Sequence, residues 1–291
     1  MQRKELTFDV IEVLKGAMDK FLPELVQKVR EILEPRDLKL FDYVFGHYYQ
    51  GEKIKGRWYD KYHNPLAVLF AGKAVKLGQA PPETIQGANW HDIGYAFIDP
   101  ELKDRGESKE NLQAVYLSRI LHMQKVVGPT ARMLIKSGDF TPDKIGRILD
   151  VVVSHDNGNL GLPIVEEPLF LAVRDADRTL PMHLISFYKD WLNVTSQRED
   201  FSLLDLFRSR TVTFYDASDA APAIWGKPEK LTKEDEFSSR RVPFTPLAKE
   251  WRDRQFEARW QEIQSNILRD ENSFRQYAEQ HIQFEIAAGR G

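Results

Sequence analysis

Cysteine is absent from the 291 residues of the chain. Disulfide bonds, thiolate metal ligands and a cysteine nucleophile are therefore excluded. Long apolar runs are also missing, since the longest, such as Val151 to Val153, are far too short to cross a bilayer. The start of the chain carries Asp9 and Glu12 and lacks the apolar core of a signal peptide. These absences predict a cytoplasmic protein with no membrane partner.

An excess of charge of one sign is missing too. The 41 Lys and Arg residues nearly balance the 44 Asp and Glu residues, which leaves a net charge of −3. We therefore expect no nucleic-acid partner, because such proteins usually carry a strongly basic surface. The hydrophobic content of 42% and the charged content of 29% are typical of globular proteins. The chain is long enough for a substantial core, and we expect residues 1–291 to form a single domain.

Strand-like alternation is scarce, whereas apolar residues recur three or four positions apart along most of the chain. This periodicity predicts an all-α fold. The first helical segment is expected at 7–33, with a break or kink near Pro23. A second is expected at 37–49, and a third at 64–78, where Gly78 is a typical C-terminal signal.

Proline marks the start of three expected helices. Pro65 fits the first turn of the third segment, where its missing N–H costs nothing, and this places His63 at or just before the helix start. Pro81-Pro82 opens the helix that carries His91 and Asp92. Thr141-Pro142 opens another that reaches His155. Further helices are expected at 109–135, with a break at Gly128-Pro129, at 166–177 and at 247–287, whereas 195–246 has no clear pattern.

Imidazoles and carboxylates stand inside these apolar segments. Such groups are costly to bury unless they are paired or bound to a metal. Side chains that converge from separate helices would form one divalent-cation site. Imidazole and carboxylate ligands suit Mn, Fe, Co, Ni, Zn or Mg, and a carboxylate beside a histidine could bridge to a second ion. The residues concerned are His63, His91, Asp92, His155 and Asp177.

Four short elements occur in order on the expected helices: Tyr62-His63, His91-Asp92-Ile93-Gly94, Val152-Val153-Ser154-His155 and Ala176-Asp177-Arg178. Together they resemble the HD metal-dependent phosphohydrolase superfamily over residues 60–180. The resemblance implies an HD-like helical bundle at about 37–195, flanked by N-terminal helices at 7–33 and a C-terminal extension at 196–291. It also implies four metal ligands, which are His63, His91, Asp92 and Asp177, and hydrolysis of phosphoesters, frequently in nucleotides.

The chain departs from the family's pattern at two places. Members with two metals carry additional histidines, and His155 fits one of these positions. His122 fits the other poorly, because Gln124 stands at the expected place and an offset of two residues rotates a helical side chain by about 200°. We therefore expect His122 to face away from the site. Tyr95 stands where many phosphodiesterase members have lysine, which argues against the cyclic-dinucleotide branch.

The sequence thus predicts a hydrolase whose metal-generated hydroxide attacks the phosphorus of a small phosphorylated substrate. Asp92 and His155 are the expected catalytic residues, with one divalent ion or two. The expected substrate-binding cations are Arg57, Lys61 and Arg178. Two alternatives stay open: a di-iron oxygenase on the same scaffold, and a degenerate domain that acts as a regulatory or interaction module.

Overall fold

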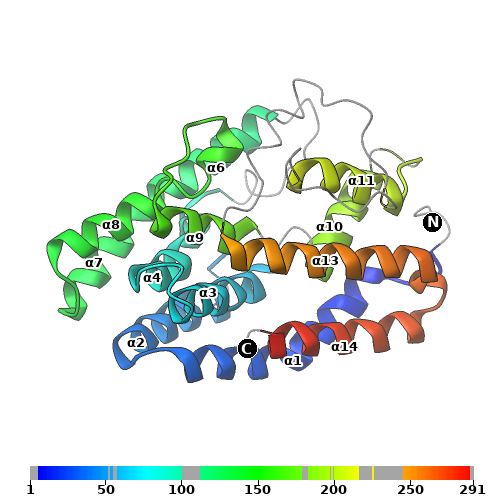
Figure 1. Cartoon of the computed structure of the whole chain (residues 1–291), viewed down its shortest axis with the longest axis horizontal. Helices are drawn as coiled ribbons and strands as arrows, with labels where there is room; N and C mark the ends of the chain where they lie inside the picture. Colours follow the sequence, from blue (N-terminus) through cyan, green and yellow to red (C-terminus); the bar gives the residue numbers. More distant parts are fainter. Residues whose placement is uncertain are drawn as a thin grey trace. The chain divides into compact units, whose positions relative to one another are not determined.

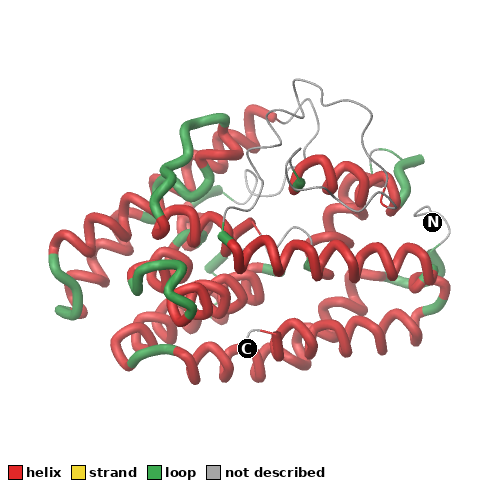
Figure 2. The backbone as a smooth tube through the Cα atoms, in the orientation of Figure 1, coloured by secondary structure: helices red, strands yellow, loops and turns green. Residues whose placement is uncertain are grey.

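A computed structural model describes residues 6–51, 53–54, 58–99, 112–178, 183–196, 198, 200–215, 225 and 245–288. Throughout these residues the regular structure is helical and no strand occurs (Figure 2). The predicted all-α fold is therefore confirmed. No helix in the described part of the chain has the length and apolar character needed to cross a bilayer.

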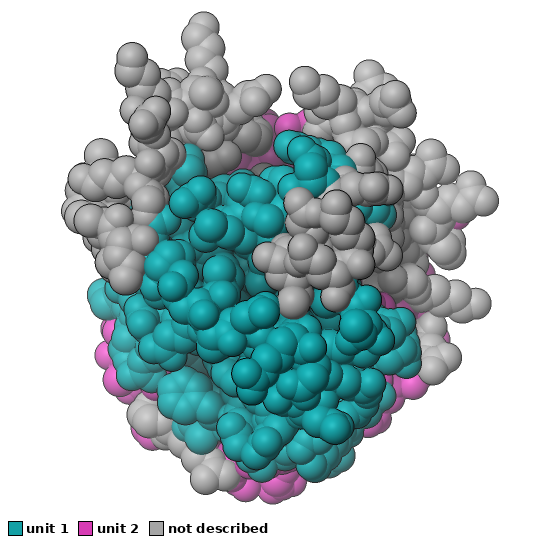
Figure 3. Space-filling model, turned by 90° about the vertical axis from the view of Figure 1, so that its right-hand side faces the viewer, with its two compact units in different colours: residues 1–23, 178–288 teal, residues 24–177, 289–291 magenta. Residues whose placement is uncertain are grey.

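The chain divides into two compact units, which Figure 3 colours separately. Unit 1 consists of residues 1–23 and 178–288, and unit 2 contains residues 24–177. Helix α1 (Val10–Ile32) runs through Pro23 and contributes to both units. The expectation of a single domain with a core at about 37–195 stays a prediction.

Unit 2 begins with helix α2 (Pro35–Val44), which continues as a π-helical turn, η2 (Phe45–Gln50). The next helix, α3 (Asp60–Lys76), is buried almost continuously from Tyr62 to Ala71. It ends before Gly78, whose φ of 69° lies in the left-handed region that favours glycine. The end of this helix is therefore as the sequence predicts.

The start of α3 differs from the prediction. The helix begins at Asp60, so His63 lies inside it and Pro65 stands beyond the first turn. Pro65 cannot donate to the carbonyl of Lys61, and one helical hydrogen bond is lost. The proline was a misleading start signal because the burial of the segment from Tyr62 onward favours helix despite this loss.

The second half of unit 2 contains a further series of helical segments, coloured from cyan to green in Figure 1. In chain order they are α4 (Glu83–Trp90), the 3-10 helix η3 (Ile93–Phe97), α6 (Leu112–Lys125), α7 (Val127–Ser137), α8 (Pro142–Val152), the 3-10 helix η5 (Asn157–Leu160) and α9 (Pro168–Arg178). The Thr141 side chain caps α8 by accepting from the N–H of Lys144, as the Thr-Pro signal predicts. The expected long helix at 109–135 is divided into α6 and α7 at Val126.

Unit 1 contains α10 (Leu184–Thr195), α11 (Leu203–Phe214), α13 (Pro246–Ser265), a short 3-10 helix η9 (Ile267–Arg269) and α14 (Glu271–Ala288). Its interior includes a buried polar network. The Glu285 carboxylate of α14 contacts the imidazoles of His183 and His281. Burial alone would raise the pKa of Glu285, but these two imidazoles outweigh it and hold the pKa well below its usual range.

Candidate metal centre

Helix α4 lies at the centre of the site because it packs against both α3 and α8. The Asn64 side-chain amide donates to the carbonyl of Asn89 over 2.9 Å, which links α3 to α4 beside the histidines. On another face, Gly87 allows close approach, since a Cβ there would lie 2.6 Å from a methyl of Val173 and 2.9 Å from one of Val151. Helix α4, which ends directly before His91, is thereby held between its neighbours.

The four ligands implied by the HD resemblance come together. Their donor atoms all lie within 4.8 Å of one another. His63 Nε2 is 2.9 Å from His91 Nε2, 3.4 Å from Asp92 Oδ2 and 3.3 Å from Asp177 Oδ1. His63 is 8% exposed and the Asp177 side chain is 19% exposed. We call His63, His91, Asp92 and Asp177 the first group.

A second group shares Asp92 with the first. It consists of Asp92, His122 and His155, whose donor atoms also lie within 4.8 Å of one another. His122 Nε2 is 3.2 Å from His155 Nε2. The other carboxylate oxygen, Asp92 Oδ1, lies 3.7 Å from His122 Nε2 and 3.9 Å from His155 Nε2. Asp92 thus presents one oxygen to each group.

In three of the imidazoles Nε2 faces a ligand group, and Nδ1 lies beside a backbone carbonyl. His91 Nδ1 lies 2.7 Å from the carbonyl of Ala88, and His155 Nδ1 lies 2.8 Å from that of Val152. His122 Nδ1 lies 3.3 Å from the carbonyl of Ser118. A carbonyl can only accept, so each Nδ1 carries a proton and a neutral ring keeps its lone pair on Nε2. These lone pairs point into the two groups, where they suit a cation.

The separations also fit metal ligation. Two ligand atoms that are each about 2.0–2.2 Å from one ion lie about 3–3.5 Å apart, depending on the angle at the ion. In the first group the distances from His63 Nε2 fall between 2.9 and 3.4 Å, and His91 Nε2 to Asp92 Oδ2 is 3.5 Å. Adjacent imidazole lone pairs at 2.9 and 3.2 Å would repel one another without a proton or a cation between them. The residues present therefore fit a divalent cation, whose identity they do not determine.

The two histidines of the first group differ electrostatically. Burial alone would lower the pKa of His63, but Asp177 and Asp92 outweigh it, and the pKa is raised. For His91, burial lowers the pKa, and the neighbouring His63 and His155 act in the same direction against Asp92. In the absence of a cation, His63 is therefore the imidazole of this group that holds a proton more readily.

His122 corrects the sequence prediction, which had it facing away from the site. Its imidazole points into the second group because α6 packs against η3 with His122 buried, whereas Gln124, at the position expected for the histidine, is exposed. Gly94 permits this approach, since a Cβ at that position would lie 1.8 Å from the carbonyl oxygen of His122. Only a residue without a side chain allows the two backbones so close. Sequence spacing alone does not reveal this contact.

Asp175, two residues before Asp177 on α9, belongs to neither group. Its carboxylate accepts from the buried Arg174 guanidinium over 3.0 Å. Sequence reasoning missed a second ion pair, in which Arg119 of α6 donates to Asp156 over 2.8 Å. Asp156 also accepts from the Asn159 side-chain amide. Because Asp156 follows His155, this pair connects the two segments that carry the histidines of the second group.

The structure describes two of the three predicted substrate-binding cations. Arg57 lies outside the described residues. Lys61 stands on α3 two residues before His63, a rotation of about 200° around the helix axis. Arg178 ends α9 directly after Asp177 and is only 8% exposed. A substrate-binding role for these three residues stays a prediction.

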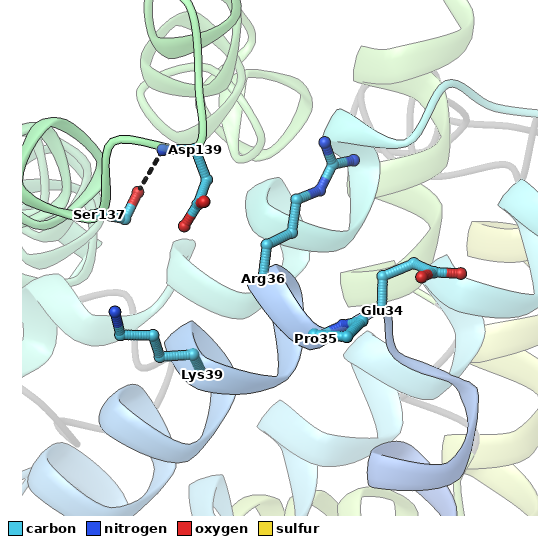
Figure 4. Close-up of a pocket in the computed structure, with 6 residues that line it drawn as sticks. All are labelled: Glu34, Pro35, Arg36, Lys39, Ser137 and Asp139. Carbon is cyan, nitrogen blue, oxygen red and sulfur yellow. Dashed lines mark hydrogen bonds between the residues drawn. The ribbon is translucent and has the colours of Figure 1, made fainter.

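A hollow of about 580 Å³ occurs elsewhere in unit 2. Figure 4 shows Arg36 and Lys39 of α2 across from Ser137, the last residue of α7, and Asp139, which lies two residues further along the chain. The N–H of Asp139 donates to the Ser137 hydroxyl over 3.3 Å. The hollow is lined by charges of both signs and by none of the ligand candidates.

No family model, curated protein or solved structure matches the chain.

Proposed function

We propose that the chain is a metal-dependent phosphohydrolase of the HD type that hydrolyses a small phosphoester, with nucleotides as the first substrate class to test. The observation that carries this proposal is the pair of ligand groups that share Asp92. The first group, with two imidazoles and two carboxylates, would hold one divalent cation. The second group would hold another through His122, His155 and the second oxygen of Asp92.

A bound divalent ion would act as a Lewis acid toward phosphoryl oxygens and generate hydroxide near neutral pH. The side chains of the protein set the geometry for this chemistry. Asp92 fixes the spacing between the two positions because its oxygens face different groups. His155 keeps its Nδ1 proton on the carbonyl of Val152, so its Nε2 is suited to hold a cation. We therefore assign both residues as ligands and not as groups that transfer protons.

A second candidate is a di-iron oxygenase. The placement of His122 supports it, because such a reaction needs two adjacent metal positions and the second group provides the additional one. The same placement serves a phosphohydrolase with two ions equally well. The identity of the metal separates the two candidates, since about two irons per chain would favour the oxygenase. A purely regulatory module is less favoured because the donor atoms of each group lie close together.

The proposal is tested by elemental analysis of the purified full-length chain, followed by a phosphatase and nucleotide screen with Mn, Fe, Co, Ni, Zn and Mg. We expect bound divalent metal and hydrolysis of at least one phosphoester. His91→Ala should abolish turnover and remove metal together, because His91 is fully buried within the first group. The matched control is His47→Ala. His47 is an exposed histidine on η2 that belongs to neither group, so this variant should keep both properties.

Two results would contradict the proposal. The first is undiminished hydrolysis by chain that has been stripped of metal with a chelator. The second is a His91→Ala variant that keeps wild-type metal content and activity. A chain that binds two irons, consumes dioxygen and hydrolyses none of the phosphoesters would instead support the second candidate.

A further inference from the structure

The His122 imidazole has the weakest backbone support of the three that point Nδ1 at a carbonyl. Its Nδ1 to carbonyl distance is 3.3 Å, compared with 2.7 Å for His91 and 2.8 Å for His155. Hydrogen bonds weaken as they lengthen beyond about 3 Å. The bond to Ser118 therefore constrains the plane of this ring less than the carbonyl bonds constrain the rings of His91 and His155.

The aromatic ring of Tyr95 lies flat against this imidazole. The two ring centroids are 4.3 Å apart and the planes differ by only 8°. Both rings are buried, since Tyr95 is 6% exposed and His122 is 1% exposed. A metal ligated by imidazole lies in the plane of the ring, along the Nε2 lone pair. A parallel ring packed on one face therefore limits the tilt that would turn this lone pair away from the second group.

Tyr95 is itself fixed relative to Asp92. The N–H of Tyr95 donates to the carbonyl of Asp92 over 3.1 Å, which closes the first turn of η3. One short turn thus carries both the shared carboxylate and the ring that packs on His122. Asp92 Oδ1 and His122 Nε2 stand 3.7 Å apart across this arrangement. Displacing the Tyr95 ring would leave Asp92 in place and free His122 to rotate.

We propose that Tyr95 is a positioning residue for the second cation, because its ring orients His122 without touching the ion. This inference rests on the proposed function, since it needs a cation in the second group. The ring, and not the phenol hydroxyl, is the part that acts.

The test is a calorimetric titration of chelator-stripped full-length chain with Co²⁺, read together with the visible absorption of bound cobalt. The wild type should show two binding events, and His122→Ala should lack the weaker one. Tyr95→Leu should weaken that second event by about tenfold, the range expected when a supporting contact of a metal ligand is removed. It should leave the first event unchanged, which serves as an internal check on folding. Tyr95→Phe retains the ring and should match the wild type.

Each other outcome has a distinct meaning. A wild type that binds no Co²⁺ overturns the proposed function. A wild type with one event that His122→Ala leaves intact overturns the inference alone. Two unchanged events in Tyr95→Leu also overturn it, as does a Tyr95→Phe variant that loses the second event. If Tyr95→Leu does not fold, Tyr95→Met, whose unbranched and more flexible side chain also lacks a ring, takes its place with the same expectations.

Discussion

Gly94→Ala should displace His122 while the first group stays assembled. The added Cβ would lie 1.8 Å from the carbonyl oxygen of His122, 2.6 Å from its carbonyl carbon and 2.8 Å from its Cα. These are backbone atoms of a helix, so they cannot move away by changing a rotamer. Helix α6 and η3 would have to separate as units.

The size of this separation can be worked out from the contact. Ordinary van der Waals contact begins at 3.4 Å, so the two backbones must part by about 1.6 Å. Metal–ligand distances tolerate only about 0.2 Å, and a shift of this size takes His122 out of reach of the second position. Overpacking of this kind also costs about 1–3 kcal/mol in the free energy of unfolding. We expect one cation per chain in place of two, and a lower melting temperature.

Elemental analysis and thermal unfolding of the purified variant measure both effects. Gly146→Ala is the matched control, because Gly146 lies inside α8 and a Cβ there meets no atom within 4 Å. That substitution should keep the metal content and stabilise the chain by about 0.5–1 kcal/mol, since alanine favours helix over glycine. Wild-type metal content and melting temperature in Gly94→Ala would refute the reasoning, because they would mean that α6 and η3 are not in close contact.

Two further predictions concern carboxylates. Asp177→Asn should reduce metal content with little change in stability. Asp175→Asn should keep the metal and lower the free energy of unfolding by about 3 kcal/mol, because it removes a carboxylate that pairs with the buried guanidinium of Arg174. Metal analysis and urea denaturation separate the two variants, and the reverse pattern would make Asp175 the ligand. In unit 1, the lowered pKa of Glu285 means that its contribution to stability is present above about pH 4.5, its ordinary value, and is lost as the pH falls below that value. The Glu285→Gln variant should therefore be less stable than the wild type at pH 7, and its free energy of unfolding should fall less on acidification. Denaturation curves measure both effects. Equal acid sensitivity of the two proteins would contradict a stabilising role for the Glu285 carboxylate.

Most of the helices could be predicted from the sequence because their signals are local. Thr141 before Pro142 marks a helix start because its side chain accepts a hydrogen bond from the N–H of Lys144, only three residues away. Gly78 marks a helix end by its own left-handed backbone conformation. Pro65 failed as a start signal because burial of the surrounding segment decided where α3 begins. That burial depends on the packing of the rest of unit 2, so the residues around Pro65 carry no local signal for it.

The candidate site divides in the same way. The convergence of His63, His91, Asp92 and Asp177 could be expected, since buried ionisable groups require partners and the resemblance supplied their order. The direction of the His122 side chain could not be expected from residue spacing, because it depends on how α6 packs against η3. The sequence does carry a signal for it in Gly94, two residues after Asp92. Glycine at such a place indicates close backbone approach, and the approaching helix is the one that carries His122.

The charges of the two groups also bear on the substrate. Asp92 and Asp177 are the only carboxylates in the two groups, and the remaining ligands are imidazoles. One divalent cation would therefore be neutralised by the first group, and a second would leave the pair with an excess of about two positive charges, of which a bound hydroxide would offset one. A positive excess inside a buried site is costly unless an anion compensates for it. The shared carboxylate thus makes binding of the second cation and of an anionic substrate mutually favourable, as linkage between two ligands requires. This coupling supports a phosphoester over a neutral substrate, because a phosphoester brings the charge that the ligands lack.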